Sequence, residues 1–117
     1  MRILYLEDEP ADAKLVERYA RMSQHQTVIV NTVEQARDTL ADPPDLILVD
    51  ILLNKRRGGY EFVSDLRAQG YEQPIIAVTG LALPLDIEKC YQAGFTEVLT
   101  KPYTVQQLAD VLKRYGS

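Results

Sequence analysis

The sequence has little of what several classes of protein depend on. Its 117 residues include no tryptophan, one histidine (His25) and one cysteine (Cys90). A single cysteine cannot form an internal disulfide or build a cysteine-based metal site. No apolar run approaches the roughly 20 residues that a membrane-spanning helix needs. We therefore expect neither a disulfide scaffold nor a membrane protein.

Acidic residues outnumber basic ones, with 17 Asp and Glu against 13 Lys and Arg. The formal net charge is −4, which argues against direct binding to nucleic acid, because such binding needs a basic surface. The first residues lead straight into an apolar run and carry no signal peptide, so we expect a cytoplasmic location. The length and the hydrophobic content of 46% suit one globular domain. We expect residues 1–117 to form a single domain without an output domain.

What the sequence does contain is a set of short apolar runs that each end in a chemically useful residue. Their length and their content of Val, Ile and Leu favour strands that are buried on both faces of a parallel sheet. The carboxyl ends of such strands share one edge of the sheet, where α/β proteins form their sites. The four runs are Ile3–Leu6, Leu46–Val49, Ile75–Val78 and Val98–Thr100.

The segments between the runs have the features of helices. Pro10 suits the first position of a helix. Thr32–Gln35 and Thr104–Gln107 are capping boxes, in which the Thr and Gln side chains satisfy backbone N–H groups at the helix start. The helix that begins near Pro10 is expected to bury an apolar stripe made of Leu15, Val16, Tyr19 and Met22.

A further strand over Thr27–Val30 completes five β–α units. Alternating units predict an α/β fold with a parallel sheet and right-handed crossovers. The doubly wound order 2-1-3-4-5 is the natural one for five units. We therefore predict a (βα)5 sandwich in which Thr27–Val30 lies at the sheet edge. The four strands that end in chemically useful residues then lie side by side.

Acidic residues follow two strands that this order makes neighbours. Glu7 and Asp8 come after the first strand, and Asp50 comes directly after the third. Clustered carboxylates repel one another unless a cation is present, and hard oxygen ligands suit Mg²⁺ or Mn²⁺. Glu9 and Asp12 are interpreted differently, as acids that solvate the loop or cap the following helix.

A hydroxyl and an ammonium complete this edge of the sheet. Thr79 follows the fourth strand and Lys101 follows the fifth; together they offer the donors and the positive charge that a phosphoryl group needs. Asp50 can then act as a nucleophile and form an aspartyl phosphate. Lys101 precedes a proline, where cis peptide bonds are nearly confined, and a cis Lys101–Pro102 peptide would turn the lysine over the site.

These strand ends carry four motifs that together resemble the receiver (response regulator) domain of two-component phosphorelay signalling. The resemblance covers the whole chain and implies a flavodoxin-like fold, which has the predicted strand order. The motifs are Leu6-Glu7-Asp8-Glu9-Pro10, Leu48-Val49-Asp50-Ile51, Val78-Thr79-Gly80 and Thr100-Lys101-Pro102.

The resemblance implies a role for each acid of the site. It makes Asp50 the phosphoacceptor and Asp8 a direct Mg²⁺ ligand. Glu7 would hold the ion mostly through water. The backbone carbonyl of Leu52 would complete the protein ligands of Mg²⁺.

The resemblance also implies the partners. Thr79 would bond the phosphoryl group and Lys101 would pair with it. The donor would be a phosphohistidine on a histidine kinase or a histidine phosphotransfer protein, and the result would be altered binding to a downstream protein target. The domain would then catalyse only its own phosphorylation and dephosphorylation, and would not otherwise be an enzyme.

The chain departs from the family pattern at several positions. Asn54 replaces a usual proline, in a loop that we expect to run to Gly59 and to be one residue longer than usual. Val98 replaces an aromatic residue that swings inward on activation. Leu52 and Leu81 stand where residues beside the phosphoryl group are often polar.

These departures leave a second hypothesis open, that the chain is a pseudo-receiver that acts only as a protein-binding module. Two other readings are weaker. A phosphatase with an aspartate nucleophile would need a second aspartate at the position of Leu52. A flavodoxin-like cofactor binder would need a Gly/Ser/Thr-rich phosphate loop after the first strand.

Overall fold

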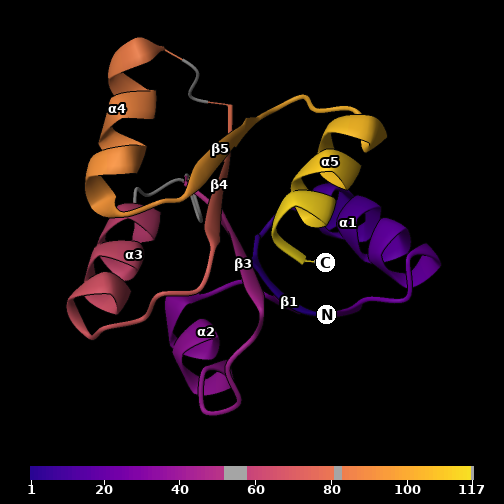
Figure 1. Ribbon diagram of the computed structural model, residues 1–117, viewed down its shortest axis with the longest axis horizontal. Helices are drawn as coiled ribbons and strands as arrows, with labels where there is room; N and C mark the ends of the chain where they lie inside the picture. The colour runs from indigo at the N-terminus through magenta and orange to yellow at the C-terminus, as the bar shows by residue number, and fades with distance from the viewer. Residues whose placement is uncertain (52–57, 81–82, 117) are drawn as a thin grey trace.

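A five-stranded parallel sheet forms the centre of the molecule, with helices on both of its faces (Figure 1). The computed structural model describes residues 1–51, 58–80 and 83–116. The strand order is β2-β1-β3-β4-β5, so the predicted doubly wound topology is confirmed. The strands are β1 (Arg2–Leu6), β2 (Gln26–Val30), β3 (Leu46–Asp50), β4 (Ile75–Thr79) and β5 (Glu97–Thr100).

The helices form two layers around this sheet. Figure 1 shows one pair, α1 and α5, on one face, while α2, α3 and α4 cover the other. This arrangement follows from right-handed crossovers between parallel strands. The helices of the described residues are α1 (Pro10–Met22), α2 (Val33–Thr39), α3 (Gly58–Ala68), α4 (Pro84–Ala93) and α5 (Val105–Gly116).

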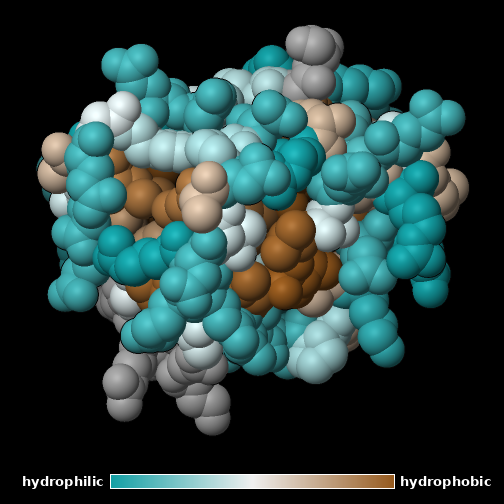
Figure 2. Space-filling view, turned by 90° about the horizontal axis from the view of Figure 1, so that it is seen from below, coloured by the Kyte–Doolittle hydropathy of each residue, from teal (hydrophilic) through white to brown (hydrophobic). Residues whose placement is uncertain are grey.

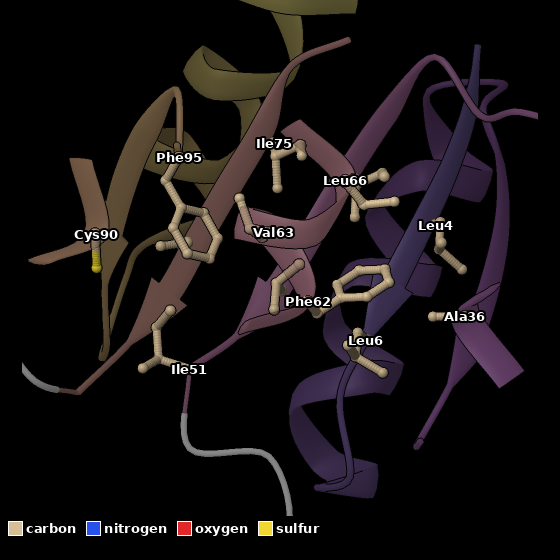
Figure 3. Packing of buried hydrophobic residues seen from close by; sticks show 13 residues of the cluster. Leu4, Leu6, Ala36, Ile51, Phe62, Val63, Leu66, Ile75, Cys90 and Phe95 are labelled. Atoms are coloured by element: carbon tan, nitrogen blue, oxygen red, sulfur yellow. The ribbon is translucent and has the colours of Figure 1, made fainter. Parts of the chain in front are cut away.

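Successive side chains of each strand enter opposite cores, because they alternate across the sheet. In β1, Leu4 and Leu6 pack under α2, α3 and α4, beside Phe62 (Figure 3). Tyr5, between them, packs under α1 and α5 with Leu108. Full burial of such a side chain contributes about 1.5–3 kcal/mol. The strands are therefore held from both sides, as their apolar runs predict.

The buried face of α1 differs from the predicted stripe. Val16 is buried, but Leu15 is 38% exposed and Met22 is 78% exposed, so the prediction was wrong for these two residues. Ala13 and Ala20 complete the buried face instead. Their small side chains let the helix lie close to the sheet, and Tyr19, the remaining residue of the predicted stripe, packs partly buried against this core.

Both predicted capping boxes begin helices. Thr32 Oγ1 accepts a hydrogen bond from Gln35 N at 3.1 Å. Thr104 Oγ1 accepts from Gln107 N at 3.1 Å, and Gln107 Oε1 accepts in return from Thr104 N at 2.8 Å. These bonds satisfy N–H groups that have no partner inside the helix. The local sequence is therefore enough to place the start of α2 and of α5.

Helix α3 begins earlier than predicted. The loop was expected to run to Gly59, but α3 starts at Gly58 and Gly59 is already buried in its first turn. A Cβ at Gly59 would lie 3.1 Å from Val49 Cγ1 and 3.3 Å from the Asp50 carbonyl oxygen. Glycine therefore allows α3 to pack directly against the end of β3.

The face of the molecule drawn in Figure 2 combines hydrophilic and hydrophobic surface. Figure 2 shows the molecule from below, with hydrophilic side chains around the rim of this face and hydrophobic atoms visible between them. Among the described residues, no helix is both long enough and apolar enough to span a bilayer.

Candidate functional site

Three carboxylates meet at the carboxyl edge of the sheet. Glu7 and Asp8 follow β1, and Asp50 is the last residue of β3, the strand paired with β1. One carboxylate oxygen from each lies within 4.8 Å of the others. Glu7 is 2% exposed and Asp50 is 8% exposed, whereas Asp8 is exposed. The proximity expected from the strand order is therefore present.

Lys101 reaches into this cluster from the segment after β5. Its Nζ donates hydrogen bonds to Glu7 Oε1 and to Asp12 Oδ2, each at 2.9 Å. It lies 3.7 Å from Asp50 Oδ2. The Lys101–Pro102 peptide is cis. One partly buried ammonium thus lies beside three acidic side chains, those of Glu7, Asp12 and Asp50.

The charges of the cluster shift one another's pKa values. Burial is the main cause that raises the pKa of Glu7 to about 9; Asp50 adds to this rise and Lys101 opposes it. Burial lowers the pKa of Lys101, but its contacts with Glu7, Asp12 and Asp50 outweigh burial and hold that pKa above its ordinary value. Lys101 is therefore an ammonium at any physiological pH, and Glu7 tends to keep a proton.

Thr79 closes the same edge from β4, which lies between β3 and β5. It is 1% exposed. It pairs with Thr100 in the sheet register, and its carbonyl oxygen accepts a hydrogen bond from Lys101 N at 2.7 Å. The backbone of Thr79 therefore fixes the point at which Lys101 leaves the sheet.

Asp12 belongs to this site, although sequence reasoning interpreted it as a loop or helix-end acid. The hydrogen bond from Lys101 shows that this interpretation was wrong. Burial raises the pKa of Asp12, but hydrogen bonds with Lys101 and Glu7 outweigh burial and lower it. A sequence signal existed: Asp12 lies one helical turn before the buried Val16, on the face of α1 that meets the sheet.

Other expectations fall on residues that the structure does not describe. The predicted carbonyl ligand, Leu52, lies outside the described residues, and so do Leu81 and Asn54. Glu9 agrees with its interpretation as a solvated acid, since it is exposed, and its side chain makes no capping hydrogen bond to α1.

The carboxylates of the cluster suit a hard divalent cation. Glu7, Asp8 and Asp50 offer oxygen atoms at close range. Among the described residues, Glu7 Oε2 is buried and has no hydrogen-bond partner. Oxygen ligands with open positions for water favour Mg²⁺. The donor set and the unsatisfied oxygen therefore fit the ion that the sequence predicts.

Comparison with known families identifies the class of the protein. Residues 3–113 match the response regulator receiver domain. The chain therefore belongs to the receiver domain family of two-component response regulators, and the predicted resemblance is confirmed.

Two similar curated proteins are longer response regulators. The heme response regulator HssR of Staphylococcus saprophyticus is 28% identical over 118 residues, which cover 97% of this chain and 52% of that protein. The probable C4-dicarboxylate response regulator DctR of Halalkalibacterium halodurans is 30% identical over 118 residues, which cover 98% of this chain and 51% of that protein. The chain thus spans about half the length of these relatives.

Solved structures share both the fold and the family. The receiver domain of sensor histidine kinase PA1611 from Pseudomonas aeruginosa has a TM-score of 0.85 at 35% identity, covering 99% of this chain and 98% of that chain; it holds a magnesium ion in its active site cleft. The BeF3-activated receiver domain of Klebsiella pneumoniae RstA has a TM-score of 0.89 at 25% identity, covering 98% of this chain and 97% of that chain.

Proposed function

We propose that this receiver domain is a phosphorylatable switch in which Asp50 accepts a phosphoryl group in a Mg²⁺-dependent reaction. The observation that carries the proposal is the convergence of the Lys101 ammonium and three carboxylates at the end of β3. A carboxylate nucleophile beside a fixed cation is the arrangement that phosphoryl transfer to aspartate requires.

The donor is a phosphohistidine of a histidine kinase or histidine phosphotransfer protein. A bond forms between an Asp50 carboxylate oxygen and phosphorus while the phosphorus–nitrogen bond of the donor breaks. The electron pair of that bond stays on the imidazole nitrogen. Lys101, partly buried beside Asp50, offsets the negative charge of the phosphoryl oxygens, and the hydroxyl of Thr79 donates to one of them.

Asp8 and Asp50 hold Mg²⁺ directly in this proposal, Glu7 holds it mainly through water, and the Leu52 carbonyl completes the set. The ion supplies positive charge that lets a phosphoryl group approach clustered carboxylates. The PA1611 receiver domain, with its coordinated magnesium ion, supports this assignment. Asp8 lies at the exposed side of the cluster, so an ion can reach it from solvent.

The switch acts by changing its binding to a downstream protein. We also propose that it works in the cytoplasm, as one domain over residues 1–117, without membrane or direct nucleic-acid contacts of its own. The net charge of −4 supports the last point.

Intact-mass measurement after incubation with acetyl phosphate and Mg²⁺ tests the proposal. We expect one added phosphoryl group on the unmodified chain and none on Asp50→Asn. Excess EDTA should abolish the addition as well. Phosphorylation that persists in Asp50→Asn or in EDTA would contradict the proposal, and complete absence from the unmodified chain would favour the pseudo-receiver instead.

A further inference from the structure

The side chain of Asp12 competes with the acceptor for the Lys101 ammonium. An ammonium has three N–H donors. Lys101 directs two of them to Glu7 Oε1 and Asp12 Oδ2, each at 2.9 Å. The Asp50 carboxylate is farther away, at 3.7 Å, beyond the usual length of a hydrogen bond.

We propose that Asp12 is a positioning residue that holds Lys101 back from Asp50 until a phosphoryl group competes for the ammonium. The inference rests on the proposed function, because it concerns how the site receives that group. Asp12 contacts Lys101 and Glu7, and its proposed role is exerted through Lys101.

Differences in burial decide which contact of Lys101 yields. The Glu7 side chain is 0% exposed, whereas the Asp12 side chain is 38% exposed. Water solvates Asp12 once it is released, but Glu7 Oε1 would lose its hydrogen-bond donor at a place where water has no access. Ion pairs near the surface are also weaker, because solvent screens them. The contact with Asp12 is therefore the one that breaks when the negative charge at Asp50 grows.

Removing the charge of Asp12 has two effects that act in the same direction. It frees the ammonium to approach Asp50, and it removes one negative charge from the surroundings of an incoming anion. Glu9 separates the two effects, because it is an exposed acid of the same segment whose side chain makes no capping bond. Glu9→Gln removes a nearby charge without touching Lys101.

Calorimetric titration with beryllofluoride at saturating Mg²⁺ measures the effect, because beryllofluoride on Asp50 imitates the phosphoryl group. We expect Asp12→Asn to bind it about two- to fivefold more tightly than the unmodified chain, the range for losing one partly exposed ion pair. Glu9→Gln should stay close to the unmodified chain, and Asp12→Glu, which keeps the charge, should restore most of the original affinity. Asp12→Asn that binds no more tightly than Glu9→Gln would overturn the inference.

A second measurement tests whether Asp12 acts through Lys101. In a Lys101→Met background, Asp12→Asn should raise the affinity for beryllofluoride no more than Glu9→Gln does. A larger rise in affinity from Asp12→Asn in this background would overturn the positioning role. If Lys101→Met does not fold, the ¹⁵N resonance of the Lys101 ammonium replaces it. This resonance should move in Asp12→Asn without beryllofluoride and stay in place in Glu9→Gln, and no movement in either variant would overturn the inference.

Failure of this inference is distinguishable from failure of the proposed function. If the unmodified chain neither binds beryllofluoride nor takes a phosphoryl group from acetyl phosphate, both are wrong. If it does both, and Asp12→Asn behaves like Glu9→Gln, the positioning role alone is wrong.

Discussion

Lys101 Nζ donates a hydrogen bond to Glu7 Oε1 over 2.9 Å, although 94 positions separate the two residues along the chain. Lys101 follows β5 and Glu7 follows β1, and two other strands, β3 and β4, lie between them in the sheet. The contact therefore links the residues that follow β1 and β5, and Asp50, at the end of β3, comes from a strand between these two. It makes the charge balance of the site depend on the whole fold.

Magnesium should stabilise the folded domain. A ligand that binds only the native state raises its stability by mass action, by about 1.4 kcal/mol at a free concentration ten times Kd. For a domain of this size we expect thermal unfolding to rise by about 5 °C. The gain should disappear in Asp8→Asn and persist in Glu9→Gln.

Without divalent cations, Asp8→Asn and Asp50→Asn should each unfold at a slightly higher temperature than the unmodified chain, because each relieves repulsion within the cluster. Differential scanning calorimetry in EDTA and in Mg²⁺ provides both comparisons. If Mg²⁺ raised the unfolding temperature equally in Asp8→Asn and Glu9→Gln, Asp8 would not be a ligand of the ion.

Stability in EDTA should fall as pH rises from about 5 to 9. The pKa of Glu7 rises from 4.5 in the unfolded chain to about 9 in the fold, chiefly through burial. In that range the folded state keeps a proton that the unfolded state releases. Each pH unit therefore lowers the free energy of unfolding by at most ~1.4 kcal/mol. The loss is absent below the unfolded pKa.

Glu7→Gln should flatten this pH dependence, because glutamine does not titrate. Urea unfolding at pH 5.5, 7 and 8.5 measures the slope. A variant with the same slope as the unmodified chain would show that Glu7 ionises normally, and that burial does not control its proton.

Arg67 should be a main stabilising residue on the side of α3 and α4. Its guanidinium donates to the carbonyl oxygens of Gly94 at 2.9 Å, Tyr71 at 2.8 Å and Gln73 at 2.9 Å. Arg67→Met leaves these acceptors without their charged donor and should cost about 2–3 kcal/mol in urea unfolding.

Arg21 provides the matched control for this substitution. It makes an exposed pair with Glu17 at 3.0 Å, and Arg21→Met should cost under about 0.5 kcal/mol. Similar losses in the two variants would mean that the hydrogen bonds of Arg67 contribute little beyond a surface charge.

Switching should not depend on an inward-swinging aromatic residue. Val98 occupies that position and is too small to fill or vacate the space of a ring; it packs partly buried against the core under α3 and α4. Thr79 can still be drawn toward the phosphoryl group, which would move the segment that begins at Gly80. On adding beryllofluoride and Mg²⁺, amide shifts in NMR spectra should concentrate between Gly80 and Leu85. Shifts confined to α1 and β2 would refute this account.

Local patterns were enough to predict most of the fold. The apolar runs specify strands buried on both faces, and the side chains of Thr32 and Thr104 each bond a backbone N–H close by in sequence. Such interactions act over a few residues, so the chain order alone reveals them. Strand order then followed from packing rules that hold for parallel sheets in general. With that order, the clustering of Glu7, Asp8 and Asp50 could be predicted as well.

The errors arose where packing between distant elements decides the outcome. Hydrophobicity favoured Leu15 and Met22 for the buried face of α1, but the closeness of helix and sheet selects Ala13 and Ala20. Gly59 was predicted to lie in a loop. Its place in α3 depends on a close approach to the carbonyl of Asp50, which belongs to a separate strand, β3. Neither contact leaves a local signature in the sequence.

The sequence by itself determined which residues end the strands and hence which acids, hydroxyl and ammonium can meet at one edge of the sheet. Tertiary structure alone decided how the ammonium is shared. Lys101 lies closer to Asp12 and Glu7 than to Asp50. The reason is physical: the strength of each ion pair depends on distance and solvent exposure, and both are set by how α1 and the segment after β5 pack against the sheet.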